Sequence, residues 1–248
     1  MRIIEGLSAL YDAALALAYP HACGACGVSS VEARSDMPAC AGCWAAAKLF
    51  TGGETLCWKC GAPAQGAAPE AAREGVRCRR CEAEEFTAAR SCGIYEGALR
   101  AAVLYLKREP FPSARLVRML AAAQSRPPLD RATVVMPVPL HPERERERGF
   151  NQAAVLARAL ARARGLRLDE WSLARVSHTE RHRAGMDARA RRETVEGAFK
   201  VVRPRLVRDE SPLIVDDVLT TGATISACAA ALKGAGACEV FVLTLARA

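Results

Sequence analysis

Twelve consecutive residues, 213–224, limit what this 248-residue chain can fold into more than any other stretch. Residues 213–215 are apolar and two of them are β-branched, which predicts a short buried strand. Two adjacent carboxylates follow, then a polar loop that contains a glycine, and then a helix expected over 225–234 and closed by Gly234. This order forms half of a nucleotide-type α/β site, in which ligands bind at the carboxyl ends of strands.

The groups in this stretch suit a ribose 5-phosphate. Backbone N–H groups in a turn before a helix make a concave site for a phosphate, and here they come from Thr220, Thr221, Gly222, Ala223 and Thr224. When ionised, Asp216 and Asp217 only accept hydrogen bonds, so they suit paired ribose hydroxyls or a hydrated Mg²⁺. The competing interpretation is an ordinary strand–turn–helix in which the acid pair caps the helix.

The whole run resembles the motif that binds 5-phosphoribosyl 1-diphosphate (PRPP) in type I phosphoribosyltransferases. Hydrophobic residues, Asp-Asp, hydrophobic residues and Thr-Thr-Gly-x-Thr match it over the full run. The resemblance implies that residues 220–224 hold the 5-phosphate, and that Asp216 and Asp217 act as catalytic residues that orient the ribose and help to hold Mg²⁺. It implies transfer of a pentosyl group, but it does not identify the acceptor.

Strands and helices alternate around this run. Strands expected at 133–138 and 239–245, with a helix from 152 to about 164, complete a βαβ series with it. Such a series predicts an α/β fold with a parallel sheet and right-handed crossovers. Shorter elements, a strand and two helices, are expected at 91–95, 99–107 and 114–123.

The N-terminal part contains eight of the 11 cysteines as four pairs, each with two residues between its members. The pairs are Cys23/Cys26, Cys40/Cys43, Cys57/Cys60 and Cys78/Cys81. A C-x-x-C turn directs two thiolates at one ion, so two turns complete a tetrahedral zinc site and four predict two structural zinc ions. Glycine follows the first and third pairs, which favours pairing in sequence order. Crossed pairing (first with third, second with fourth) stays open, and redox dithiols are the alternative to zinc.

Three segments are therefore expected along the chain. Residues 1–20 contain an amphipathic helix, residues 21–85 form the double zinc ribbon, and residues 90–248 form the phosphoribosyltransferase-like domain. Glu5 and Asp12 interrupt the apolar N-terminal run, so it does not predict a signal peptide. With no apolar segment of about 20 residues, we expect no membrane span and a cytoplasmic protein with reduced thiols.

Arginines near the expected site are candidates for binding diphosphate. Residues 143–148 alternate Glu and Arg, which normally indicates a solvated helix face. Their place between a strand and a helix is, however, where a type I phosphoribosyltransferase binds pyrophosphate, which makes Arg146 and Arg148 candidates. Arg191 is a third candidate, in a basic segment 174–199 expected to close over the ligand as a hood or else to be a loop with no role.

The order Pro-Val-Pro-Leu-His (137–141), Arg-Gly-Phe-Asn-Gln (148–152) and Gly-Ala-Phe (197–199) makes the resemblance narrower. With the Cys pairs, it is similar to the ComF family, which joins a double zinc ribbon to a phosphoribosyltransferase-like domain. The resemblance covers nearly the whole chain. It implies a role in DNA uptake during natural transformation, with single-stranded DNA and a competence helicase or other DNA-uptake protein as partners. Arg183 and Thr194 stand where the family tends to have Gln and Asn, so the acceptor pocket is not defined.

The charge distribution leaves more than one function open. The net charge is +8, and residues 90–248 carry 27 basic and 17 acidic side chains. This excess suits a polyphosphate substrate or nucleic acid, or it reflects a soluble Arg-rich surface. The hypotheses are a phosphoribosyltransferase, a single-stranded nucleic-acid-binding competence protein with a non-catalytic nucleotide pocket, and a structural adaptor built on the zinc ribbons.

Overall fold

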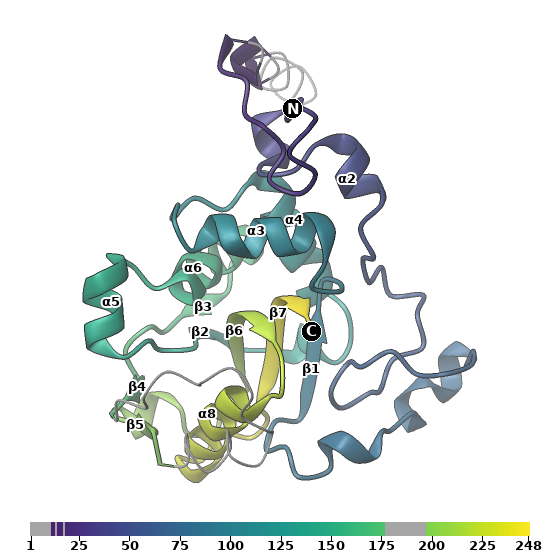
Figure 1. Ribbon diagram of the computed structural model, residues 1–248. Helices are drawn as coiled ribbons and strands as arrows, with labels where there is room; N and C mark the ends of the chain where they lie inside the picture. Colours follow the sequence, from purple (N-terminus) through teal and green to yellow (C-terminus); the bar gives the residue numbers. More distant parts are fainter. Residues whose placement is uncertain (1–10, 13, 17, 177–196) are drawn as a thin grey trace.

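A five-stranded parallel sheet organises the chain from residue 88 onward (Figure 1). The computed structural model describes residues 11–12, 14–16, 18–176 and 197–248. All the strand pairs of this sheet are parallel, which confirms the fold class expected from the alternating pattern. In spatial order the strands are β1 (Ala88–Ser91), β7 (Phe241–Arg247), β6 (Pro212–Leu219), β2 (Val134–Pro137) and β3 (Arg167–Leu168).

Helices cover both faces of the sheet because successive strand residues point to opposite faces. Leu213 and Val215 of β6 belong to a core shared with helices on one face. Ile214, between them, belongs to a second core with α8 (Ala223–Gly234) on the other face. The helices of the first face are α3 (Gly97–Leu106), α4 (Ala114–Gln124) and α6 (Gln152–Arg164).

Short elements complete the described chain. A two-stranded antiparallel sheet pairs β4 (Leu173–Arg175) with β5 (Phe199–Val201), and most of the expected hood, residues 177–196, lies between them in sequence and outside the described residues. Arg183, Arg191 and Thr194 therefore lie outside the described residues, as does most of the expected N-terminal helix. The remaining elements are η1 (Arg34–Asp36), α2 (Ala41–Ala45), η2 (Glu70–Gly75), η3 (Arg79–Cys81), η4 (Leu129–Arg131), α5 (Pro142–Arg148) and η5 (Pro204–Leu206).

Several expected boundaries are wrong. β6 does not end at residue 215, because Val218 and Leu219 still pair with β7, so the acid pair lies within the strand. The helix expected from residue 225 begins at Ala223, and Gly234 is its last helical residue. The first strand lies at 88–91 instead of 91–95. Residues 142–148 form the helix α5, which agrees with the helix face that the Glu/Arg alternation of residues 143–148 indicates.

The cysteine-rich segment packs along the side of the sheet domain (Figure 1). Its first half contacts α4, where Asp36 accepts from Arg115 at 2.9 Å. Its second half runs beside β1, where Ala89 N donates to Lys59 O at 2.6 Å. Both halves of the segment are therefore joined to the sheet domain by polar contacts.

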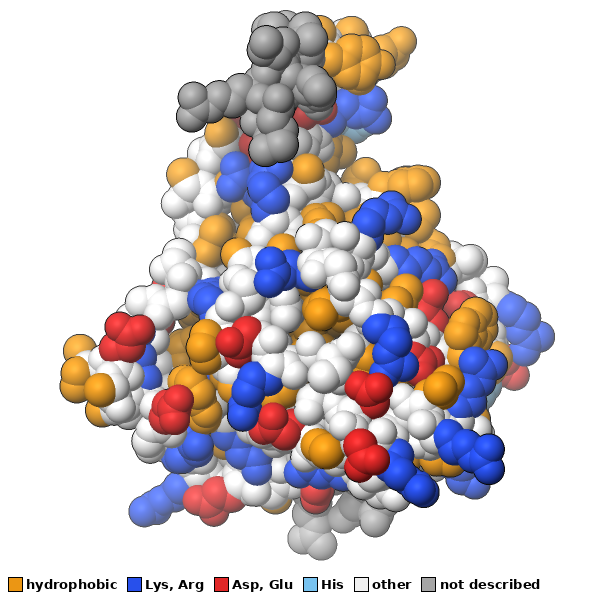
Figure 2. Space-filling model, turned by 180° about the vertical axis from the view of Figure 1, so that it is seen from behind, with side chains coloured by type: hydrophobic (Ala, Val, Ile, Leu, Met, Phe, Trp, Pro, Cys, Tyr) orange, Lys and Arg blue, Asp and Glu red, His pale blue; other side chains and the backbone are white. Residues whose placement is uncertain are grey.

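Charged side chains of both signs are interspersed over the face drawn in Figure 2. The described part of this face therefore shows no extended basic patch. None of the helices in the described part of the chain has the length and apolar character needed to cross a bilayer.

Candidate functional site

The acid pair lies at the carboxyl end of β6, in the middle of the sheet. Asp217 is 8% exposed and its backbone N–H donates to Asp216 Oδ1 at 2.8 Å. Burial and the neighbouring charge of Asp217 raise the pKa of Asp216 well above its usual value. Two neighbouring carboxyl groups favour a proton or a cation between them. Of these two, the cation, Mg²⁺, is what the sequence predicts.

Gln152 connects the acid pair to α5. Its side chain is buried, and Nε2 donates to Asp217 Oδ2 at 3.3 Å. Its Oε1 accepts a hydrogen bond from Arg148 Nη1. Asn151 holds this arrangement in place, since it caps α6 by accepting from Ala153 N and donates to Val138 O, both at 2.9 Å. The Arg148 guanidinium, the Gln152 amide and the Asp217 carboxylate therefore form a chain of hydrogen bonds at this edge of the sheet.

The structure separates two of the three arginines proposed for diphosphate, Arg146 and Arg148. Arg148 is half-buried and belongs to the chain that ends on Asp217. Arg146 is exposed, and its Nε donates to Pro142 O of its own helix at 3.3 Å. The geometry brings Arg148 to the acid pair and leaves Arg146 outside, while Arg191 lies beyond the described residues.

We call residues 220–224 the phosphate loop. Gly222 has φ +81° and forms the N-cap of α8 without a side-chain cap, so the acid pair does not cap this helix. Among the described residues, the backbone N–H groups from Thr221 to Thr224 have no hydrogen-bond acceptor. These donors lie at the N-terminus of a 12-residue helix, where the partial positive charge favours an anion. The loop therefore keeps the groups that a phosphate needs.

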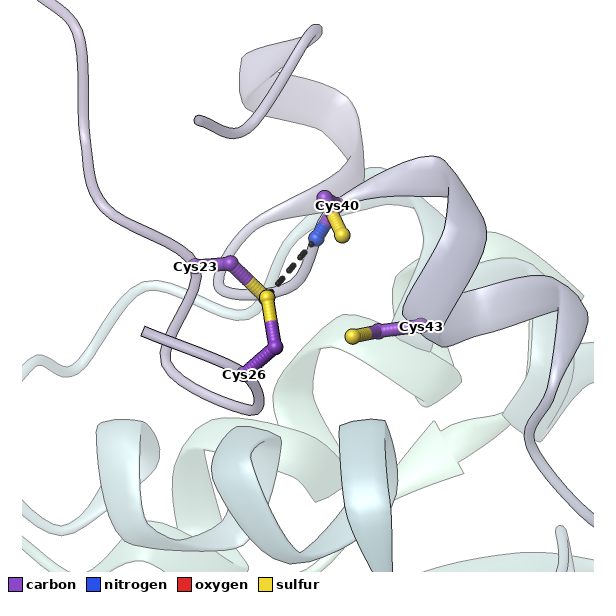
Figure 3. A group of neighbouring side chains, drawn as sticks. All are labelled: Cys23, Cys26, Cys40 and Cys43. Carbon is purple, nitrogen blue, oxygen red and sulfur yellow. Dashed lines mark hydrogen bonds between the residues drawn. The ribbon is translucent and has the colours of Figure 1, made fainter. Parts of the chain in front are cut away.

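The eight paired cysteines form two groups. The first tetrad is Cys23, Cys26, Cys40 and Cys43, and the second is Cys57, Cys60, Cys78 and Cys81. Within each group all sulfurs lie within 4.8 Å of one another, so pairing in sequence order is confirmed and crossed pairing is wrong. Figure 3 shows the first tetrad, in which a loop and α2 bring the side chains together.

The sulfur positions fit a tetrahedral metal site. In the second tetrad Cys57 and Cys81 have sulfurs 3.6 Å apart, and Cys60 and Cys78 have sulfurs 3.5 Å apart. Four thiolates at the usual zinc–sulfur distance lie about 3.8 Å from one another. Both tetrads could therefore hold a metal ion such as zinc, with all four positions filled by protein.

Backbone N–H groups support the thiolate form of one cysteine in each tetrad, Cys23 and Cys57. Cys40 N donates to Cys23 Sγ at 3.2 Å, and Cys78 N donates to Cys57 Sγ at 3.3 Å. Burial acts to raise the pKa of Cys23 and Cys57, but such N–H groups outweigh it and lower the pKa of each to about 6.

Comparison with known proteins agrees with this geometry. The family described as "Phosphoribosyl transferase domain" matches residues 147–248. The DNA utilization protein YhgH of Salmonella typhimurium (strain LT2) is 32% identical over 203 residues, which cover 78% of this chain and 84% of that protein. Competence protein F of Haemophilus influenzae is 36% identical over 118 residues, which cover 46% of this chain and half of that protein.

The chain belongs to the ComF family. In this ComF protein the parallel sheet begins well before residue 147, because β1 and β2 precede the matched domain. Among solved structures, the glutamine PRPP amidotransferase of B. subtilis complexed with ADP and GMP is 20% identical, with a TM-score of 0.38. That similarity covers 57% of this chain and 30% of the solved one.

Sequence patterns missed some features of this ComF site. The hydrogen bond from Gln152 to Asp217 joins residues 65 positions apart, so no local pattern predicts it. Glu84 of the cysteine-rich segment lies beside Gly222, since a Cβ built on this glycine would lie 3.3 Å from Glu84 Oε2. No local signal in the chain predicts a contact between the cysteine-rich segment and the phosphate loop.

Proposed function

We propose that this ComF protein binds PRPP, or a related ribose 5-phosphate ligand, together with Mg²⁺. The observation that carries the proposal is the row of N–H donors in the phosphate loop, which follows a central strand with two carboxylates near its carboxyl end. The loop would hold the 5-phosphate, and Asp216 and Asp217 would orient the ribose hydroxyls. Arg148 would contact the diphosphate.

This arrangement suits transfer of the phosphoribosyl group. Breaking the bond between C1 and diphosphate develops positive charge on the ribose and negative charge on the leaving group. Rate enhancement then comes from positioning and electrostatics, so no nucleophilic side chain is needed. Gln152 would hold Arg148 toward the leaving group and Asp217 toward the ribose. Bound Mg²⁺ would neutralise charge on the diphosphate, and Asp216 and Asp217 are the residues that would help to hold it.

Calorimetric titration with PRPP in the presence of Mg²⁺ tests the proposal. We expect saturable binding of one ligand per chain, and a double variant with Asp216→Asn and Asp217→Asn should lose it while keeping its fold by circular dichroism. Ribose 5-phosphate and inorganic phosphate identify which part of the ligand contributes. Unchanged affinity in the folded double variant would contradict the role of the acid pair.

We also propose that each tetrad binds one zinc ion as a structural centre. The segment 21–85 contains few large apolar side chains, so metal binding would supply the stability that a small core cannot. Metal analysis of protein purified under reducing conditions should give two zinc ions per chain, and a Cys43→Ser variant should give close to one. Protein that contains no metal after purification under reducing conditions would refute this assignment.

A second candidate function is binding of single-stranded DNA with a nucleotide pocket that does not turn over. The names of the two relatives, a DNA utilization protein and a competence protein, favour it. DNA contacts through Lys and Arg release counterions, so the affinity should fall steeply as salt rises. A titration with an oligonucleotide over a salt series measures this; steep salt dependence without PRPP binding would select this function over the first.

A further inference from the structure

A cavity of about 410 Å³ lies between the second tetrad and the phosphate loop. Cys60, Cys81 and Glu84 form part of one wall, and residues 220–222 form part of the other. Two ligands of the expected metal therefore face the same space as the loop that is proposed to bind phosphate. The cavity raises the question of whether the tetrad holds this loop in place.

Arg247 joins the second tetrad to the strand pair beneath the loop. Its Nη1 donates to Cys60 O at 2.6 Å, and its Nη2 lies 3.9 Å from Cys60 Sγ. Arg247 is the last residue of β7 and pairs in register with Leu219, the last residue of β6. The phosphate loop begins at the next position. The side chain of Arg247 thus connects Cys60, an expected metal ligand, to the strand ends from which the phosphate loop starts.

A second connection holds the far side of the loop. Glu85 N donates to Ser226 Oγ at 2.9 Å, on the first turn of α8. Glu84, one position earlier, lies against Gly222 inside the loop. Glu84 and Glu85 follow Cys81 closely in sequence. A metal that fixes Cys81 therefore also limits where these two residues can lie.

The first tetrad is attached elsewhere. Its neighbour Asp36 accepts from Arg115 Nε of α4 at 2.9 Å, and the Arg115 guanidinium lies 5.3 Å from the ring centre of Trp44. α4 packs on the sheet face opposite α8. The two tetrads therefore have similar chemistry but different connections, and only the described contacts of the second lead to the phosphate loop.

We propose that the second tetrad, and not the first, positions the phosphate loop, with Arg247 as the positioning residue that connects them. The inference rests on the proposed function in one respect, that the loop binds the 5-phosphate. The metal of the second tetrad would then support the ligand pocket without contacting the ligand. It would fix Cys60 and Cys81, and the contacts made through these two residues would hold the loop from both sides.

Two arginine variants form a matched test on the full-length, metal-loaded protein. Arg247→Gln breaks the connection of the second tetrad, and Arg115→Gln breaks that of the first. In calorimetric titrations with Mg²⁺ and PRPP, we expect Arg247→Gln to weaken binding about tenfold, as the loss of an outer contact of a metal site typically does. Arg115→Gln should bind as the wild type does, and Arg247→Lys, which keeps a donor to Cys60 O, should recover most of the affinity.

Hydrogen exchange without ligand separates this inference from the proposed function. Arg247→Gln should lose protection over residues 219–226, and Arg115→Gln should not. If the wild type fails to bind PRPP, the proposed function is wrong, and the exchange pattern alone still decides whether the second tetrad holds the loop. Equal protection of residues 219–226 in both variants, or equal PRPP affinity of both, would overturn the inference.

Discussion

At the scale of single residues, one buried amide decides which arginine of α5 faces the acid pair. Gln152 Oε1 accepts from Arg148, and its Nε2 donates to Asp217. Arg146, two positions from Arg148 in a helix, points to another side and donates to Pro142 O of its own helix. The alternating sequence made these two arginines equivalent, and the helical geometry of α5 removes that equivalence.

Arg148→Ala should therefore weaken PRPP binding, whereas ribose 5-phosphate, which has no diphosphate, should bind as before. Loss of charge-assisted hydrogen bonds costs about 2 kcal/mol, or about thirtyfold in Kd. Arg146→Ala is the matched control and should leave both affinities unchanged. Titration of each variant with both ligands in Mg²⁺ buffer gives the comparison, and equal losses in the two variants would refute the role given to Arg148.

Asp216 should make the stability of the ligand-free protein depend on pH. Burial and the charge of Asp217 raise its pKa, so the folded state keeps a proton that the unfolded state has already released. Stability from this group is then lost as pH rises from the usual aspartate pKa toward the raised value. In Mg²⁺-free buffer the Tm of Asp216→Asn should exceed that of the wild type by an amount that grows with pH in this window. A constant difference would argue against this origin.

At the scale of elements, the junction of β6 and α8 creates the proposed binding site. β6 carries the acid pair near its carboxyl end, and Gly222, with φ +81°, turns the chain so that α8 begins with N–H groups that have no acceptor among the described residues. The strand, the loop and the helix were all predictable, because each has a local pattern of apolar, acidic or small residues. The full length of β6 was not, because its acid pair interrupts the apolar run while β7 still pairs with Val218 and Leu219.

Gly222→Ala tests this junction. A side chain at positive φ costs about 1–2 kcal/mol, and here the new Cβ would also lie 3.3 Å from Glu84 Oε2. Gly165→Ala, at the end of α6, has φ +64° and nothing within 4 Å of its Cβ, so it carries the backbone cost without the contact. Both variants should lower the free energy of unfolding, but Gly222→Ala should also weaken phosphate binding. Unaltered phosphate affinity in Gly222→Ala would show that this turn does not shape the site.

At the scale of the whole molecule, the two tetrads of the cysteine-rich segment are connected to different parts of the sheet domain. The first tetrad is joined to α4 through Asp36 and Arg115, and the second is joined to β7 and α8 through Arg247 and Ser226. The Cys spacing predicted two tetrads, and the glycines after the first and third pairs favoured the sequential pairing that the structure shows, while crossed pairing stayed open. It could not predict these contacts, because Glu85 and Ser226 lie 141 positions apart and carry no local signal of their pairing.

Removal of metal should loosen this segment before the sheet. Its described helices are short, α2 having five residues, so thiolate–metal bonds would supply most of its stability. A zinc chelator with reductant should therefore abolish hydrogen-exchange protection over residues 21–85 while β2, β6 and α6 stay protected. Loss of protection in both parts at the same chelator concentration would mean that the sheet domain depends on metal as well.

The central claim is that the phosphate loop holds an anion and the acid pair faces a ribose, and a crystal structure with Mg²⁺ and PRPP tests it most directly. The account predicts a 5-phosphate within hydrogen-bonding distance of the N–H groups of Thr221 to Thr224, with the ribose hydroxyls turned toward Asp216 and Asp217. A ligand bound elsewhere, with those N–H groups bonded inside the protein, would contradict it.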